Sequence, residues 1–113
     1  MPTLNRTAII LRPKQPFIDW INENDPDGRP VTLEELADDN AVYLVSEDRD
    51  DNVERAMRGY WEEIFEEELF GWYTDEALWP KRLTYAMFQE WFDVEVHSVV
   101  CELGADDLIV EED

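Results

Sequence analysis

The clearest hydrophobic pattern in the chain lies between residues 51 and 73. Apolar side chains recur there at intervals of three and four residues, which is the period of one buried face of an α-helix. These side chains belong to Val53, Met57, Tyr60, Trp61, Ile64, Phe65, Leu69 and Trp72. Asp51 followed by Glu54 is a variant of the capping box, and Gly71 is typical of a helix C-terminus. The pattern predicts a long central helix near residues 51–72.

Shorter patterns on either side predict a small sheet and more helices. Runs of β-branched and other apolar residues predict strands at 7–11, 41–45 and 94–103. The last run has apolar residues on both faces, which predicts a strand covered at least partly on each side. Helical spacing predicts helices at residues 16–24, for about two turns after Thr32, and at residues 84–92.

This order of elements favours an α+β fold, in which a three-stranded sheet packs with about four helices. The sheet gains a fourth strand if the apolar residues after Gly104 join it. A mostly helical domain with a minor sheet is the alternative. Because 113 residues suit one modest core, we expect residues 1–113 to form a single domain with loose ends at 1–6 and 104–113.

The extreme feature of the composition is a net charge of −20, from 29 acidic and nine basic residues. Nucleic-acid binding through phosphates requires a basic surface, and anionic membranes repel an acidic one, so neither is an expected partner. A basic protein is the electrostatically favoured partner. Cys101 is the only cysteine, and no apolar run near the N-terminus is long enough for a secretory or membrane segment. We therefore expect a cytoplasmic protein.

Two positions break the pattern of the central helix. Glu68 projects into its apolar face, where a carboxylate needs a partner or a proton. The candidate partners are Arg12, Lys14, Lys81, Arg82 and His97. A structural ion pair, or a helix end that turns Glu68 to the rim, is favoured over a functional acid with a raised pKa. Gly59 costs a helix about 1 kcal/mol relative to alanine, which predicts a close packing contact there.

The residues that most often carry chemistry do not form a recognisable site. Glu62, Glu63, Glu66, Glu67 and Glu68 are dense, but no histidine follows them as in carboxylate-bridged di-iron sites, and most diverge around the helix. His97 and Cys101 share a strand face about 13 Å apart, too far for a nucleophile–base pair. Cys101 is expected to be a small core residue. Glycine-rich phosphate loops are absent, so we expect neither a metal nor a cofactor.

The few basic residues suggest one pocket hypothesis. Arg12 and Lys14 follow the first predicted strand, and Lys81 and Arg82 follow Trp79. If these segments meet, the cations and the side chains of Trp20, Trp72 and Trp79 would line a cleft for a small anionic or aromatic ligand. The alternative is that the cations only offset neighbouring acids.

The segments LNRTAIILRPKQPFIDW, EEIFEEELFGWY, WP and FQEWF occur in that order over nearly the whole chain. In this order they resemble a family of small acidic bacterial proteins. The resemblance implies a bacterial, cytoplasmic, single-domain protein, and it supplies no catalytic residue.

Three functional hypotheses remain, and the first is preferred. In it the protein is a non-enzymatic interaction protein that docks a basic protein partner through the acidic surface around Glu63 and Glu67. A special form of this hypothesis is mimicry of nucleic acid. The second is a small-ligand binder or enzyme that uses Arg12, Lys14, Lys81, Arg82 and Glu68. In the third, the charge serves only solubility.

Overall fold

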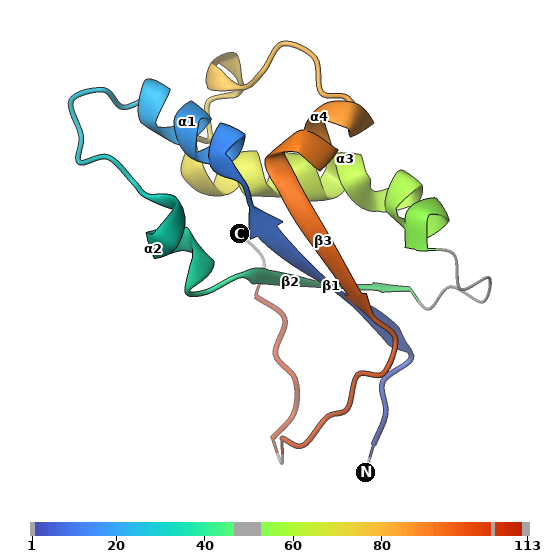
Figure 1. The fold of residues 1–113 in the computed structure, drawn as a ribbon. Coiled ribbons are helices and arrows are strands. Elements are labelled where there is room, and N and C mark those ends of the chain that lie inside the picture. The colour runs from blue at the N-terminus through green and yellow to red at the C-terminus, as the bar shows by residue number, and fades with distance from the viewer. Residues whose placement is uncertain (1, 47–52, 105, 112–113) are drawn as a thin grey trace.

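The computed structural model describes residues 2–46, 53–104 and 106–111, and it shows helices gathered on one face of a small sheet (Figure 1). The strands are β1 (Arg6–Pro13), β2 (Ala41–Ser46) and β3 (Phe92–His97). They form an antiparallel sheet in the order β2-β1-β3. The helices are α1 (Gln15–Glu23), α2 (Leu33–Ala37), α3 (Val53–Trp72) and α4 (Tyr85–Trp91), with a 3₁₀-helix η1 (Glu76–Leu78) before α4. The predicted α+β fold class is confirmed.

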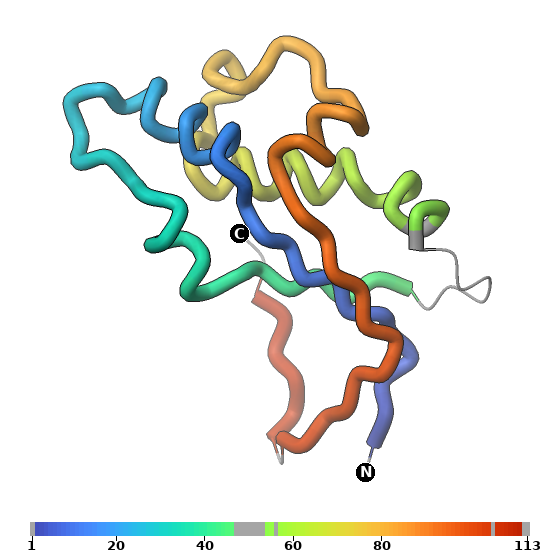
Figure 2. Tube along the Cα trace, viewed as in Figure 1, coloured from blue at the N-terminus to red at the C-terminus, as the bar shows by residue number. Residues whose placement is uncertain are grey.

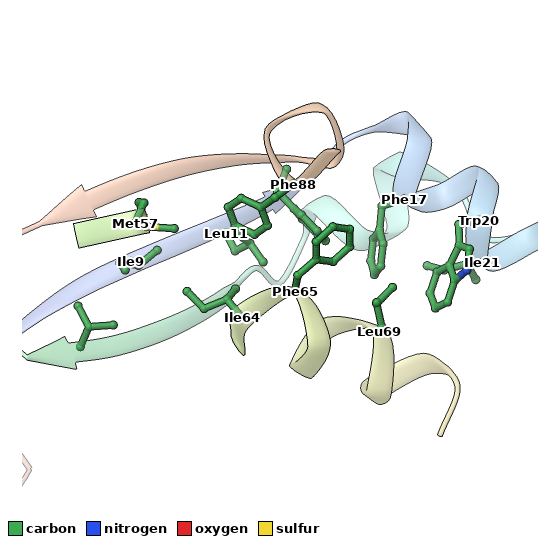
Figure 3. Packing of buried hydrophobic residues seen from close by; sticks show 12 residues of the cluster. Ile9, Leu11, Phe17, Trp20, Ile21, Met57, Ile64, Phe65, Leu69 and Phe88 are labelled. Atoms are coloured by element: carbon green, nitrogen blue, oxygen red, sulfur yellow. The ribbon is translucent and has the colours of Figure 1, made fainter. Parts of the chain in front are cut away.

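The core lies between the sheet and the helices α1, α3 and α4 (Figure 3). Side chains alternate along β1, so Ile9 and Leu11 both point toward the helices and are buried. Phe65 and Leu69 on α3 are fully buried in the same layer. The ring of Phe65 lies 5.8 Å from that of Phe88, one of several aromatic contacts that join α3 to α4. None of the described helices is both long and apolar enough to cross a bilayer.

Local capping signals set where the shorter helices begin. The hydroxyl of Thr32 accepts a hydrogen bond from the Glu35 amide at 3.2 Å, and that of Thr84 accepts one from the Met87 amide at 3.1 Å. Each bond satisfies an amide that has no partner within its helix. Both predicted helix starts are confirmed. The predicted cap at Asp51 lies outside the described residues.

Both glycines of α3 lie inside the helix, whose end at Trp72 matches the predicted range, whereas the prediction of a close packing contact at Gly59 was wrong. The helix does not end at Gly71 but includes it and ends at Trp72, where the Tyr73 amide still donates to the Leu69 carbonyl oxygen at 2.9 Å. Beyond its chain neighbours and the adjacent helix backbone, a β-carbon at Gly59 would meet no heavy atom of the described residues within 4 Å. The α-helix thus continues through both glycines, and Gly59 faces solvent rather than a packing partner.

The third strand differs from its prediction in place and in environment. It begins at Phe92, directly after α4, and ends at His97 rather than extending to residue 103. Its side chains alternate cleanly. Phe92, Val94 and Val96 pack on the core, whereas Asp93, Glu95 and His97 lie on the opposite face. Within the described residues, apolar packing therefore covers only one face of β3.

The two ends of the chain also differ from the predictions. After β3 the chain continues antiparallel beside the N-terminal residues (Figure 2), where Thr3 and Cys101 form an isolated β-bridge. The Leu4 amide donates to the Val100 carbonyl oxygen at 2.7 Å, so the lead-in is not loose. Cys101 is exposed rather than in the core. Residues 106–111 add no fourth strand to the sheet.

Candidate functional site

Tyr43 on β2 and Glu68 on α3 meet at the interface between the sheet and its longest helix. The Tyr43 hydroxyl donates a hydrogen bond to Glu68 Oε2 at 2.5 Å. Burial raises the pKa of Glu68; the bond from Tyr43 opposes this shift, and the nearby charge of Glu67 adds to it. Burial and the hydrogen bond to Glu68 raise the pKa of Tyr43, which keeps its phenol protonated. Glu68 thus has a phenol as its partner in place of the predicted cation.

A groove of about 290 Å³ lies on one side of this pair, between β2 and α3. We call it the β2 groove, and it is lined by Tyr43, Leu44, Val45, Tyr60, Glu63, Ile64 and Glu67. Leu44 points to the opposite face of the strand from Tyr43 and Val45. Because all three line the groove, it follows the outer edge of β2.

The outer edge of β2 is unpaired within the described part of the chain. Among the described residues the strand β2 pairs only with β1, and no described backbone group hydrogen-bonds to its other edge. Such an edge presents backbone N–H and C=O groups that can pair with a further strand. The sheet face opposite the helices is open beside this edge, because Val42 and Leu44 are 57% and 49% exposed.

A second groove, of about 310 Å³, lies on the other side of the Tyr43–Glu68 pair. We call it the Trp72 groove, and it is lined by Leu11, Pro13, Phe17, Leu36, Asp39, Asn40, Ala41, Glu68 and Trp72. Trp72 is 40% exposed, unlike Phe17, which is 2% exposed. The Oδ1 atom of Asn40 is buried and has no hydrogen-bond partner among the described residues.

The acidic residues of α3 divide into two sets. Glu63 and Glu67 line the β2 groove, and Glu68 lines the Trp72 groove. Glu62 and Glu66 are exposed and line neither. Among the residues that the structure describes, no lysine, arginine or histidine lines either groove, so none of them neutralises the field of the surrounding acids there.

Two of the predicted site cations lie on the face of the sheet opposite the core or at its edge. Arg12 Nη1 donates to Glu95 Oε2 at 2.7 Å, and this bond holds the pKa of Glu95 below its usual range. Lys14 Nζ donates to the Gln89 carbonyl oxygen at 3.0 Å and lies 3.6 Å from Asp93. Arg12 therefore joins β1 to β3. Lys14, directly after β1, contacts the end of α4 and the start of β3, and neither cation is paired with Glu68.

The segment after α3 does not join Glu68 either. Lys81 and Arg82 are exposed and form no ion pair with a described residue. Trp79 is half-buried, and its Nε1 donates to the Tyr73 carbonyl oxygen at 2.8 Å. Trp20 Nε1 likewise donates to the Leu78 carbonyl oxygen at 3.0 Å. The structure brings Glu68 and Trp72 into one groove and leaves the four cations outside it.

Reactive groups are not paired in the described residues. His97 is exposed, and its Nε2 lies 3.4 Å from Glu95 Oε1 rather than against a thiol. No group of three or more histidine, cysteine, aspartate or glutamate side chains in the part of the chain that the structure describes could hold a metal ion. The two grooves offer hydrogen-bond acceptors, an unpaired strand edge and exposed apolar surface, and these features can bind a partner or a ligand.

Sequence patterns missed Tyr43, Asn40 and Tyr60 as site residues. Tyr43 occupies an inward position of the predicted strand, so its alternation with Val45 was a usable signal that it faces a helix. Nothing local indicates that α3 lies along β2 rather than β3. No family model matches the chain, and no curated protein or solved structure matches it either.

Proposed function

We propose that the protein is a non-enzymatic interaction protein that binds an extended, basic segment of a protein partner along the outer edge of β2. The observation that carries this proposal is the position of the unpaired edge. It opens onto a groove that has apolar walls and is rimmed by Glu63 and Glu67. A strand edge selects an extended backbone, and the acidic rim selects its charge.

The geometry supplies both affinity and specificity. The added strand pairs its backbone with the free N–H and C=O groups of β2, as in other cases of β-strand addition. Alternate side chains of that strand point toward the helix side, where apolar ones cover Tyr60, and the others point to the open face beside Leu44. Lysine or arginine side chains at the rim meet Glu63 and Glu67.

The charge of the whole chain supports the same partner. A net charge of −20 accelerates the encounter with a basic segment, and salt screens this attraction. The exposed thiol of Cys101 suits a reducing compartment, so the proposal places the protein in the cytoplasm.

Fluorescence anisotropy with a labelled peptide that is rich in valine and lysine tests the proposal. Binding should weaken steeply as salt rises. The double variant Glu63→Lys/Glu67→Lys should weaken it about tenfold, because each reversal removes a rim attraction and adds a repulsion. Glu62→Lys/Glu66→Lys is the matched control, since it makes the same charge change on the same helix outside the groove.

A backbone-modified peptide separates strand addition from charge attraction alone. N-methylation of alternate residues removes hydrogen-bond donors without changing the charge of the peptide, so it should abolish most of the binding. Equal affinity of the methylated and unmethylated peptides would show that no strand is added. Equal losses in the two double variants would show that the β2 groove is not the docking surface.

A further inference from the structure

The Trp72 groove has a chemistry that the proposed strand addition does not use. Its polar lining consists of Glu68, Asp39 and Asn40, which offer carboxyl and amide oxygens, and no basic side chain of the described residues lines it. The rest of the lining is apolar or aromatic. At about 310 Å³ the groove falls at the lower end of the range for small-molecule sites, roughly 300–1,000 Å³.

Two acceptors in this groove have spare capacity. Glu68 accepts one hydrogen bond, through Oε2 from Tyr43, and no described residue donates to its Oε1. Asn40 Oδ1 is buried without any partner in the described chain. An acceptor in that position costs free energy until a donor reaches it. A ligand that brings several N–H donors would relieve both deficits, once the Asn40 amide turns toward the groove.

Trp72 supplies the third element. It is a large aromatic side chain left 40% exposed beside these acceptors. Cations bind favourably over the face of an indole, and the free energy gained rises when the cation is partly desolvated. An anionic ligand would meet Glu68 and Asp39 with no cation to offset them.

We propose that the Trp72 groove binds the head of an organic cation, an alkylammonium or alkylguanidinium group, with its hydrocarbon arm against Leu36, Leu11 and Phe17. The head donates to the Glu68 carboxylate and the Asn40 amide oxygen and contacts the indole of Trp72. The site stands whether or not a strand adds to β2, because the two grooves share only the Tyr43–Glu68 boundary.

Cation binding is coupled to the protonation of Glu68. A cation favours the carboxylate, so its affinity should rise with pH through the raised pKa of that group. Three other titratable groups lie near the Glu68 carboxyl group: Tyr43 on β2, Glu67 on α3 and Asp39 in the loop before β2. These three groups are still present in Glu68→Gln. The difference between the pH profiles of cation affinity for the natural chain and for Glu68→Gln therefore reports the titration of Glu68.

Titration of the full-length, isotope-labelled chain with butylguanidinium and butylamine tests the site by NMR. The readout is the indole N–H resonance that is missing from Trp72→Phe. Both cations should shift it saturably, whereas the neutral analogue butylurea should not. Glu68→Gln should weaken binding about tenfold, through loss of a charge-assisted hydrogen bond. It keeps an acceptor for Tyr43 and so preserves the fold.

Glu66→Gln is the control, because it removes one charge from an exposed position of the same helix. If it weakens binding as much as Glu68→Gln, the attraction is only the general acidic field and the site is overturned. An unmoved Trp72 resonance or equal binding of butylurea also overturns it. Asn40→Ala gives an independent check, because it should weaken the binding of both butylguanidinium and butylamine.

Blocked arginine, with both its amino and carboxyl groups in amide linkage, distinguishes the source of the cation. If it binds as tightly as butylguanidinium, the groove accepts a side chain of a protein partner. If only the free cations bind, the ligand is a small molecule. Glu63→Lys/Glu67→Lys should leave the saturable shift of Trp72 in place, so loss of strand addition and loss of this site are separately observable.

Discussion

Tyr43 donates a hydrogen bond to Glu68 from the edge strand to the longest helix, and the two grooves lie on either side of this contact. The bond explains how a carboxyl group is tolerated on the apolar face of α3. A half-buried acid without a donor would be costly, and the described residues offer it no cation. The same bond fixes β2 to α3 beside the unpaired edge.

Tyr43→Phe should destabilise the fold by about 1–2 kcal/mol at neutral pH, because it leaves Glu68 without its donor. The free energy of unfolding in urea measures the effect. Tyr60→Phe is the control, since the Tyr60 hydroxyl makes no hydrogen bond with a described residue and the side chain lines the adjacent groove. Equal losses in the two variants would mean that the Tyr43–Glu68 bond contributes nothing.

Stability should respond to pH through Glu68. Burial raises its pKa above the ordinary value of 4.5, so the folded chain binds this proton more tightly than the unfolded chain. The contribution of Glu68 to stability is therefore greatest below pH 4.5 and falls as pH rises through the raised pKa. At pH values above the raised pKa of Glu68, Glu68→Gln should be more stable than the natural chain. Below pH 4.5 it should lose this advantage.

Urea unfolding at a series of pH values measures this difference. Glu66→Gln serves as the control because it removes an exposed charge from the same helix. The difference in free energy of unfolding between Glu66→Gln and the natural chain should change less over the same pH range. A Glu68→Gln profile parallel to that of the natural chain would contradict a raised pKa for Glu68.

The sequence predicts the elements of this fold well because their signals are local. Thr32 and Thr84 cap helices at the predicted residues, since each cap involves an amide only three residues away. The end of the third strand was missed because Val99 and Val100 continue the apolar composition. The strand pairing is interrupted at Ser98 and Val99 and resumes between Val100 and Leu4, a contact between distant segments that no local pattern encodes.

The candidate site was predictable only in part, for a related reason. Glu68 stands out because a helix period places it among apolar residues. Its partner does not, because Tyr43 is 25 residues away and reaches it only through the packing of α3 on β2. Likewise Arg12 pairs with Glu95, 83 residues later, through strand pairing that the sequence does not specify.

Phe65 and Phe70 provide a direct test of the packing on α3. Phe65 is fully buried among aromatic rings, whereas Phe70 is 43% exposed on the same helix. Phe65→Ala should cost about 3–5 kcal/mol through lost burial and the cavity that remains. Phe70→Ala should cost much less. Urea unfolding measures both, and similar losses would contradict the orientation of α3 on the sheet.

Gly59 offers a change that should stabilise the protein. It lies inside α3, where a β-carbon would meet no heavy atom of the described residues within 4 Å apart from the adjacent helix backbone, and its own backbone is not in the left-handed region. Gly59→Ala should therefore raise the free energy of unfolding by about 0.5–1 kcal/mol, because alanine loses less conformational entropy in a helix. Gly28→Ala is the contrasting variant, since its β-carbon would lie 2.2 Å from Asp25 Oδ2 and force that side chain to move. A loss of stability in Gly59→Ala would mean that a neighbouring group occupies the space beside the helix at this turn.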